Sequence, residues 1–274
     1  MRLERGRVIT KSLAPGEHDE FVVDLRAGQV AIAAVRQRGI DVVLSVIGPD
    51  NREHHRVDRP NVEWGREGIT ILAETTGAYR LYVSPLHSVG PTGRYQLEVM
   101  GVRRAHTRDR QRVEAEREVS DAEVARSANT LEGCRQAVQR FERAASLWQE
   151  LREPYEEGVA LYGLALAHRF LGEHEESLRV LQRTLTLTRQ VGDAHAIVMA
   201  ESGLAWTHLY LDDYETAASR FRQALSQRDS SDQRGTAGDL FGLGWTELLL
   251  EKPKEALVTF KKALGLRRLV LDPK

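Results

Sequence analysis

One cysteine, Cys134, is the only possible thiol nucleophile in this sequence of 274 residues. It lies in a predicted helix three residues before the small residue Ala137, where a lone cysteine usually packs as a small apolar side chain. A single cysteine cannot form an intrachain disulfide, and the sequence has no set of four cysteines and histidines spaced for structural zinc. We therefore predict neither thiol catalysis nor a zinc site.

The histidines offer little more chemistry. His54 and His55 are neighbours on a predicted strand, so their side chains point to opposite faces and cannot hold one ion together. We interpret them as part of a solvated strand edge. His168 and His208 occupy equivalent positions of two helical repeats, 40 residues apart. A structural role between helices is the favoured interpretation, and a hydrogen bond to a bound peptide is the alternative.

Acidic and glycine-rich segments also lack the surroundings that a site needs. Asp41, Asp50 and Asp58 could suggest calcium, but no dense acidic loop contains them. The glycine-rich segment 235–244 follows no predicted strand and lacks the Lys-Ser or Lys-Thr of a phosphate-binding loop, so it favours close helix packing. We predict no metal, no cofactor and no catalytic residue, and hence no enzyme activity.

Composition excludes several classes of partner. The sequence has 39 basic and 40 acidic residues, which removes the usual argument for nucleic acid or an anionic membrane. Its apolar runs are far shorter than the ~18 residues that span a bilayer, and its first residues do not form a signal peptide. These features predict a cytoplasmic protein that binds neither nucleic acid nor membrane.

Residues 1–102 have the periodicity of β-strands. Apolar residues alternate with polar ones from Arg7 to about Gly101, as in Val30, Ile32 and Ala34, and turn residues such as Ala14-Pro15-Gly16 separate the runs. About eight short strands without intervening helices predict an antiparallel β-sandwich of jelly-roll type. Poor alternation over 59–68 predicts a long loop there.

Residues 103–274 change to helical periodicity and repeat. Shifts of 40, 40 and 39 residues align four copies, each with small residues where two helices cross and a large apolar residue that fills the gap. We predict an α-solenoid of four helix pairs of about 40 residues, which together bury what one pair cannot. The aligned columns are Ala125, Ala165, Ala205 and Gly244; Ala137, Ser177, Ala217 and Ala256; Phe141, Leu181, Phe221 and Phe260; and Ala144, Thr184, Ala224 and Ala263.

These columns resemble the tetratricopeptide repeat, most clearly from Gly163-Leu164-Ala165 to Leu185 and from Gly203-Leu204-Ala205 to Leu225. The period of 40, against about 34 in the common form, is similar to that of long-helix variants. The resemblance implies that the first helix of each pair lines a concave surface.

The segments 12–18, 25–29, 37–43 and 77–81 resemble the pre-peptidase C-terminal-like β-sandwich that precedes tetratricopeptide repeats in bacterial proteins ending in a CHAT domain. In that family the CHAT domain is a caspase-like protease that uses a histidine and a cysteine and lies after the repeats. No segment of this sequence matches it, so the resemblance transfers no protease activity to these residues.

The resemblance places an aromatic-rich set of first-helix residues on the concave surface, which we call the stripe. Tryptophan, tyrosine and arginine are enriched at interface anchors, so the stripe predicts a partner-binding groove. The alternative is that long helices bury these side chains between neighbouring repeats. The stripe comprises Tyr162, Leu166, Arg169, Ser202, Trp206, Leu209, Phe241, Trp245 and Leu248.

Together these features predict a non-enzymatic scaffold that binds a protein or peptide. The resemblance implies the sensory or regulatory part of a CHAT-type protease system; the alternative is a sandwich that binds carbohydrate or calcium, with the solenoid as a spacer. No capping helix follows the fourth repeat. We therefore expect its last helices, from Leu248 to Leu271, either to meet a downstream domain of a longer chain or to self-associate.

Overall fold

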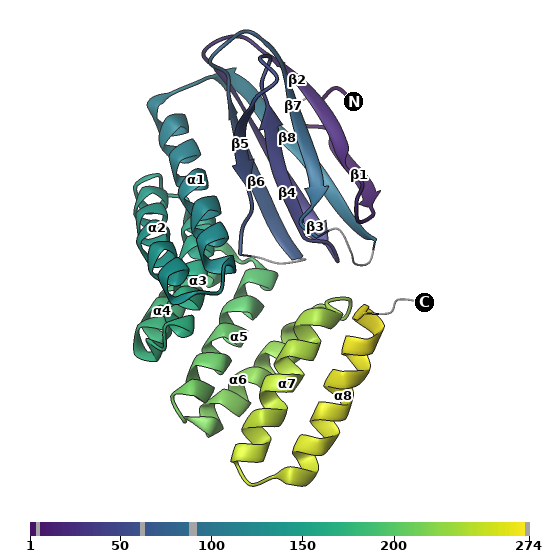
Figure 1. Ribbon diagram of the computed structural model, residues 1–274, viewed down its shortest axis with the longest axis vertical. Coiled ribbons are helices and arrows are strands. Elements are labelled where there is room, and N and C mark those ends of the chain that lie inside the picture. Colours follow the sequence, from purple (N-terminus) through teal and green to yellow (C-terminus); the bar gives the residue numbers. More distant parts are fainter. Residues whose placement is uncertain (4–5, 61–63, 88–91, 272–274) are drawn as a thin grey trace. The chain divides into compact units, whose positions relative to one another are not determined.

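The computed structural model describes residues 1–3, 6–60, 64–87 and 92–271. Before Thr107 the described residues form eight strands in two four-stranded antiparallel sheets, in the orders β1-β8-β3-β6 and β2-β7-β4-β5 (Figure 1). This arrangement confirms the predicted antiparallel fold class. The strands are β1 (Val8–Leu13), β2 (Asp19–Leu25), β3 (Gln29–Arg38), β4 (Val42–Ile47), β5 (Glu53–Val57), β6 (Trp64–Leu72), β7 (Gly77–Pro85) and β8 (Gly93–Arg104).

Alternating side chains of both sheets form one apolar core. Phe21 and Tyr79 from one sheet and Leu97 and Ile69 from the other are buried in it. Alternation explains this directly, because every second side chain of a strand points to the same face. The strands therefore follow from the two-residue period of the sequence.

The predicted loop at 59–68 is wrong for half of its length. Residues 64–68 belong to β6, and 61–63 lie outside the described residues. The alternation is hidden because Glu67, which is fully buried, takes an inward position where an apolar residue is expected. The guanidinium of Arg59, itself buried, lies 3.6 Å from the Glu67 carboxylate. A buried ion pair thus replaces an apolar contact.

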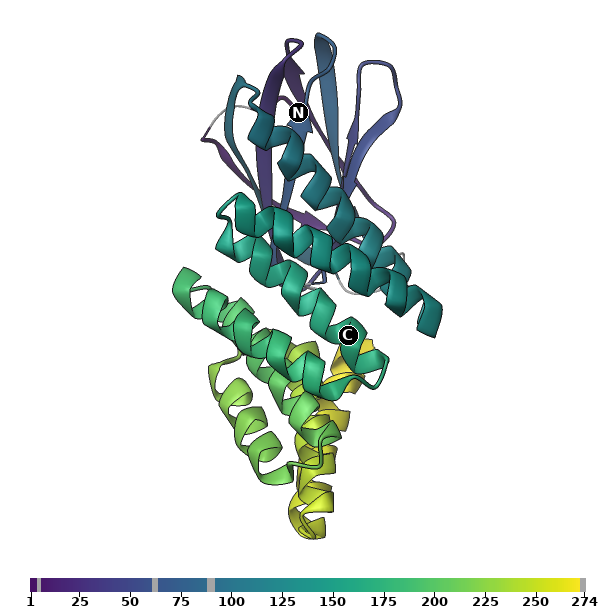
Figure 2. The ribbon, with the colours of Figure 1, turned by 90° about the vertical axis from the view of Figure 1, so that its left-hand side faces the viewer.

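Eight helices follow in the described residues, as predicted from the four repeats. From α3 onward each helix packs against the next, and the odd-numbered helices also contact one another, which gives the tetratricopeptide-type array of antiparallel pairs (Figure 2). The helices are α1 (Thr107–Ser127), α2 (Leu131–Glu150), α3 (Pro154–Phe170), α4 (His174–Val191), α5 (Ala194–Tyr210), α6 (Tyr214–Gln227), α7 (Gln233–Leu249) and α8 (Pro253–Leu271).

Packing divides the chain into two units, and their limits differ from the boundary at which the sequence periodicity changes. One unit comprises residues 1–127 and 143–153, and the other 128–142 and 154–274. Helix α1 belongs to the first unit because it packs on β5 and β6, the edge strands of the two sheets. The predicted boundary after residue 102 falls inside β8, which ends at Arg104, and α1 packs with the strands.

Capping and turn residues set the limits of the repeated helices. The side chains of Asp193 and Asp232 accept hydrogen bonds from backbone N–H groups of the first turns of α5 and α7, at 2.9 and 2.8 Å. Gly172, Asp212 and Glu251, at equivalent positions, have φ of 79°, 59° and 60° and end α3, α5 and α7. The left-handed conformation at this position reverses the chain in these three pairs.

Glycines of the odd-numbered helices lie on large side chains of the preceding helix. A methyl group at Gly242 would overlap the ring of Phe221, and one at Gly163 would overlap the ring of Phe141. Gly203 has the same relation to Leu181. The large side chains are the predicted plugs, whereas these glycines lie two residues before the predicted small residues Ala165, Ala205 and Gly244. Their contacts fix the distance between successive repeats.

Replacing Gly242 with alanine should therefore lower the free energy of unfolding by roughly 1 to 3 kcal/mol, the usual cost of overpacking. Gly238 lies one turn earlier in α7, with no atom within 4 Å of the place a Cβ would take. Gly238→Ala should stabilise the helix by up to about 1 kcal/mol. Urea unfolding followed by circular dichroism measures both changes, and effects of equal sign and size would contradict this packing.

Candidate partner-binding surface

The first two members of the stripe in α5 face the next odd-numbered helix rather than solvent. Ser202 is buried, and its hydroxyl donates a hydrogen bond of 3.0 Å to Asp239 of α7. The indole of Trp206 packs edge-on against Phe221, with ring centroids 5.4 Å apart, and lies 6.4 Å from the ring of Phe241. Ser202 and Trp206 therefore fit the alternative interpretation, in which these side chains are buried between neighbouring repeats.

The other stripe residues range from buried to exposed. Tyr162 packs on the core of α3, α4 and α5 and is half-buried, as are Leu166, Arg169 and Phe241, while Leu209 is buried. Trp245 and Leu248 of α7 are the exposed members, each 43% accessible. The stripe is therefore mainly an interface between repeats and opens to solvent in the fourth.

A second set of apolar side chains is exposed in three successive repeats. Phe170, Tyr210 and Leu249 are the last residues of α3, α5 and α7 and are 45%, 51% and 44% accessible. We call them the exposed row. Each follows directly after a stripe residue in sequence, so the 40-residue repeat contained the signal at the next position. The stripe contains the preceding residue of each repeat instead, namely Arg169, Leu209 and Leu248.

Contacts at the turns hold the exposed row in place. The imidazole of His174 stacks on the ring of Tyr210, with centroids 5.1 Å apart and planes 8° apart. Nδ1 of His168 lies 2.6 Å from a carboxylate oxygen of Glu173, and Nδ1 of His208 lies 3.0 Å from one of Asp213. Both imidazoles thus tie the end of an odd-numbered helix to the start of the next helix. These contacts favour the structural interpretation of the repeated histidine.

A buried ionic cluster joins α5, α6 and α7. The Arg228 guanidinium donates to Asp239 at 2.7 Å, to Asp232 at 2.5 Å and to the hydroxyl of Ser202 at 2.7 Å. Burial raises the pKa of the Asp239 carboxyl, and the charge of Arg228 opposes that change. The cluster fixes the repeats that carry the exposed row, and none of its residues is open to a partner.

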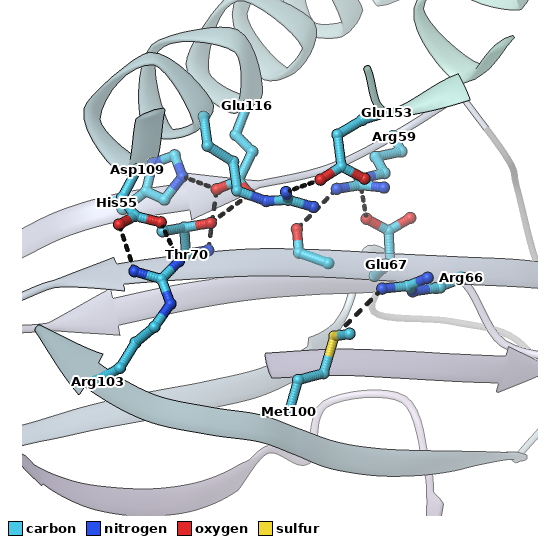
Figure 3. Close-up of polar contacts among 12 residues, drawn as sticks. His55, Arg59, Arg66, Glu67, Thr70, Met100, Arg103, Asp109, Glu116 and Glu153 are labelled. Atoms are coloured by element: carbon cyan, nitrogen blue, oxygen red, sulfur yellow. Dashed lines mark hydrogen bonds and ion pairs between the residues drawn. The ribbon is translucent and has the colours of Figure 1, made fainter. Parts of the chain in front are cut away.

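In the strand-containing unit, His55 is not the solvated edge residue that we predicted. It is buried, and its Nε2 lies 2.8 Å from Oε2 of Glu116 in α1, while His54 points away and is half-buried. Thr70 donates to the same carboxylate through its backbone N–H, at 2.9 Å, and its hydroxyl, at 2.7 Å (Figure 3). These contacts fasten α1 to the sheets.

Charges at this site modify two pKa values. Burial acts to raise the pKa of the Glu116 carboxyl, but hydrogen bonds from His55 and Thr70, with the charges of His55 and Arg59, outweigh it and lower the pKa. Burial, with the nearby charge of Glu123, raises the pKa of Asp58 to about 6. Asp58 was one of the calcium candidates. Within the described residues no three His, Cys, Asp or Glu side chains are placed to hold a metal ion.

The same unit contains a cavity of about 1030 Å³ between α1 and the sheets. Apolar residues such as Ile71 and Val113 make up part of its lining, and His55 and Thr70 lie on the sheet side. The lining also carries charges of both signs, including Arg104, Arg110, Glu114 and Asp121. The other chemical candidate, Cys134, is fully buried.

Comparisons with known proteins identify the fold of the helices. Residues 156–230 match the family model of the tetratricopeptide repeat. The apo form of RapI is similar with a TM-score of 0.52 and 19% identity, covering 56% of this chain and 55% of that one. A Rap protein complexed with competence and sporulation factor has a TM-score of 0.50 and 17% identity, covering 56% of this chain and 43% of that one. The chain thus spans about half the length of these proteins, and the likeness shows the fold alone.

For the strands, the pre-peptidase C-terminal domain of collagenase from Bacillus anthracis is similar with 19% identity, covering 36% of this chain and 91% of that one. The TM-score of 0.28 is too low to carry an argument. No curated protein matches the sequence. Among the described residues, no helix is both long and apolar enough to cross a membrane.

Proposed function

We propose that this chain is a non-enzymatic scaffold whose helical repeats bind an extended peptide or protein segment. The observation that carries the proposal is the exposed row, because large apolar side chains at one position of three successive repeats offer evenly spaced contacts to one extended ligand. The tetratricopeptide-type fold supports it, as does the Rap protein of the same fold that is complexed with competence and sporulation factor.

The proposal refines the predicted binding residues. Trp245 and Leu248 remain candidates because they are exposed, and Phe170, Tyr210 and Leu249 join them. Trp206 is assigned to packing between repeats, since its indole contacts rings of α5, α6 and α7. Trp206→Ala should therefore destabilise the protein, and it is not a clean test of binding.

Changing Phe170 and Tyr210 together to aspartate should abolish partner capture with little change in the melting temperature. Anchors of this kind each contribute about 2 kcal/mol at interfaces, so two losses weaken binding by roughly a thousandfold. Cross-linking capture, quantified by mass spectrometry, compares the variant with the unmodified chain. Val191→Asp, an exposed apolar position of α4 that is 39% accessible, is the control and should capture normally. Equal capture by the double variant would refute the proposal.

We also propose, from the sequence resemblance, that the scaffold is the sensory or regulatory part of a cytoplasmic CHAT-type protease system. The bound segment would then belong to that system. The chain itself should cleave no member of a fluorogenic peptidase panel.

A second candidate function is binding of a small polar ligand in the strand-containing unit. The cavity of about 1030 Å³ under α1 supports it, with donors and acceptors of both charges along its wall. Thermal shift with calcium and with sugars distinguishes this function from the first, because the exposed-row variants would leave any such shift unchanged.

A further inference from the structure

The last helix pair of the described residues presents an apolar surface that we call the end face. It comprises Trp245 and Leu248 of α7 with Leu257, Phe260 and Leu264 of α8; all but the half-buried Phe260 are 43% to 55% accessible. The ring of Phe260 meets the indole of Trp245 edge-on at 6.2 Å. Leu257 and Leu264 lie three and four residues from Phe260, and so share its side of α8.

The equivalent surface of the preceding repeat is a helix-binding interface. A shift of 39 residues relates Leu248 to Leu209, Leu257 to Ala218 and Phe260 to Phe221. The three earlier residues are buried, and they form one apolar core with Leu243 of α7. The end face is therefore equivalent to the surface of the third repeat that α7 covers.

The equivalent surface of the third repeat also shows which residue a bound helix needs at the point of contact. Helix α7 approaches closely because Gly242 lies on the ring of Phe221, and α5 does the same through Gly203 on Leu181. A helix on the end face would meet Phe260 in the same way. It needs a glycine at that point, because any Cβ there would strike the ring.

Charges specify the occupant further. Arg222 and Arg228 of the third repeat bind Glu247 and Asp239 of α7, at 3.3 and 2.7 Å. The shift of 39 residues places Lys261 and Arg267 at the corresponding positions of α8. The incoming helix should carry acidic residues where α7 has Asp239 and Glu247, three before and five after its glycine.

A second copy of this chain matches these requirements poorly. The exposed charges of α8 are mainly basic: Lys254, Lys261, Lys262, Arg267 and Arg268, against Glu255. Two end faces related by a twofold axis would bring these like charges together, which opposes association.

We propose that the end face binds an amphipathic helix of a partner protein, with a central glycine against Phe260 and acidic residues that pair with Lys261 and Arg267. This site shares Trp245 and Leu248 with the candidate binding residues, but it contains no residue of the exposed row and does not depend on it.

The probe is a fluorescent peptide with the 17-residue sequence of α7, Gln233–Leu249, added to the whole chain and followed by anisotropy. It should bind saturably, and Lys261→Glu with Arg267→Glu in the chain should weaken binding at least tenfold. A peptide carrying Asp239→Lys and Glu247→Lys should bind that double variant and not the unmodified chain. Gly242→Leu in the peptide should also weaken binding at least tenfold.

The exposed-row variant with Phe170→Asp and Tyr210→Asp should bind the peptide normally, which separates this proposal from the proposed function. Circular dichroism checks that each chain is folded. Absence of binding, or binding that ignores the charge reversal, overturns the proposal. So does dimerisation in light scattering that Leu257→Glu abolishes and the peptide does not, because the occupant would then be a second copy.

Discussion

Replacing Glu116 with alanine should lower the free energy of unfolding of the strand-containing unit by roughly 3 to 5 kcal/mol, the range for breaking a buried ion pair on one side. The carboxylate is 2% accessible and contacts His55 and both donors of Thr70. Without it these groups stay buried and lose their acceptor, while α1 loses its main polar attachment to β5 and β6 (Figure 3). Denaturant unfolding, followed separately by near-ultraviolet and far-ultraviolet circular dichroism, measures the loss.

Glu114→Ala is the matched control. Glu114 is also a glutamate and lies in the same turn of α1 as Glu116, but it is exposed. Its replacement should therefore lower the free energy of unfolding by no more than about 0.5 kcal/mol. A similar loss in both variants would mean that helix propensity, rather than the His55 contact, holds α1 in place.

The pH dependence gives a second readout for Glu116. Its pKa is lower in the folded protein than its ordinary value of 4.5, so the folded state holds fewer protons than the unfolded state near that pH. Its stabilisation is present above about pH 4.5 and is lost as the pH falls through the lowered value. The unmodified chain should therefore lose stability more steeply in acid than Glu116→Gln.

The sequence was sufficient to predict the two kinds of secondary structure, because each follows from a local period. Strand alternation survives in β2 and β7, and the small residues of the repeats lie where helices approach, as Gly242 does on Phe221. The strand β6 was missed where a buried carboxylate, Glu67, interrupted the alternation. The alternation of apolar and polar residues indicates which side chains are buried only where the buried side chains are apolar.

The polar contacts could not be predicted in this way. Glu116 and His55 are 61 residues apart, and nothing in either local pattern indicates that α1 packs on β5. The exposure of the candidate binding residues could not be predicted for a different reason. The repeat identified equivalent positions correctly, but the direction in which a column points depends on how successive pairs rotate. Trp206 and Trp245 are equivalent in sequence, yet Trp206 packs against Phe241 of the next odd-numbered helix, whereas Trp245 is exposed.

Replacing Arg228 with alanine should destabilise the helical unit by roughly 3 to 5 kcal/mol, because two buried carboxylates, Asp232 and Asp239, would lose their cation. Burial already raises the pKa of Asp239, and removing the neighbouring charge raises it further. A carboxyl whose pKa is raised in the folded state is more stabilising when protonated, so the deficit should shrink as the pH falls from about 8 to about 5.

Arg222→Ala, in α6, provides the comparison, because Arg228 directly follows the same helix. Its side chain is 55% accessible and lies 3.3 Å from Glu247, so its loss should cost at most about 1 kcal/mol, with little dependence on pH over that range. Urea unfolding at the two pH values measures both variants. If Arg228→Ala and Arg222→Ala lose similar stability, or if the Arg228→Ala deficit grows in acid, then Asp239 is not a buried carboxylate that depends on Arg228. The third and fourth repeats must in that case be joined chiefly by the apolar contact of Gly242 with Phe221, which the Gly242→Ala measurement reports independently.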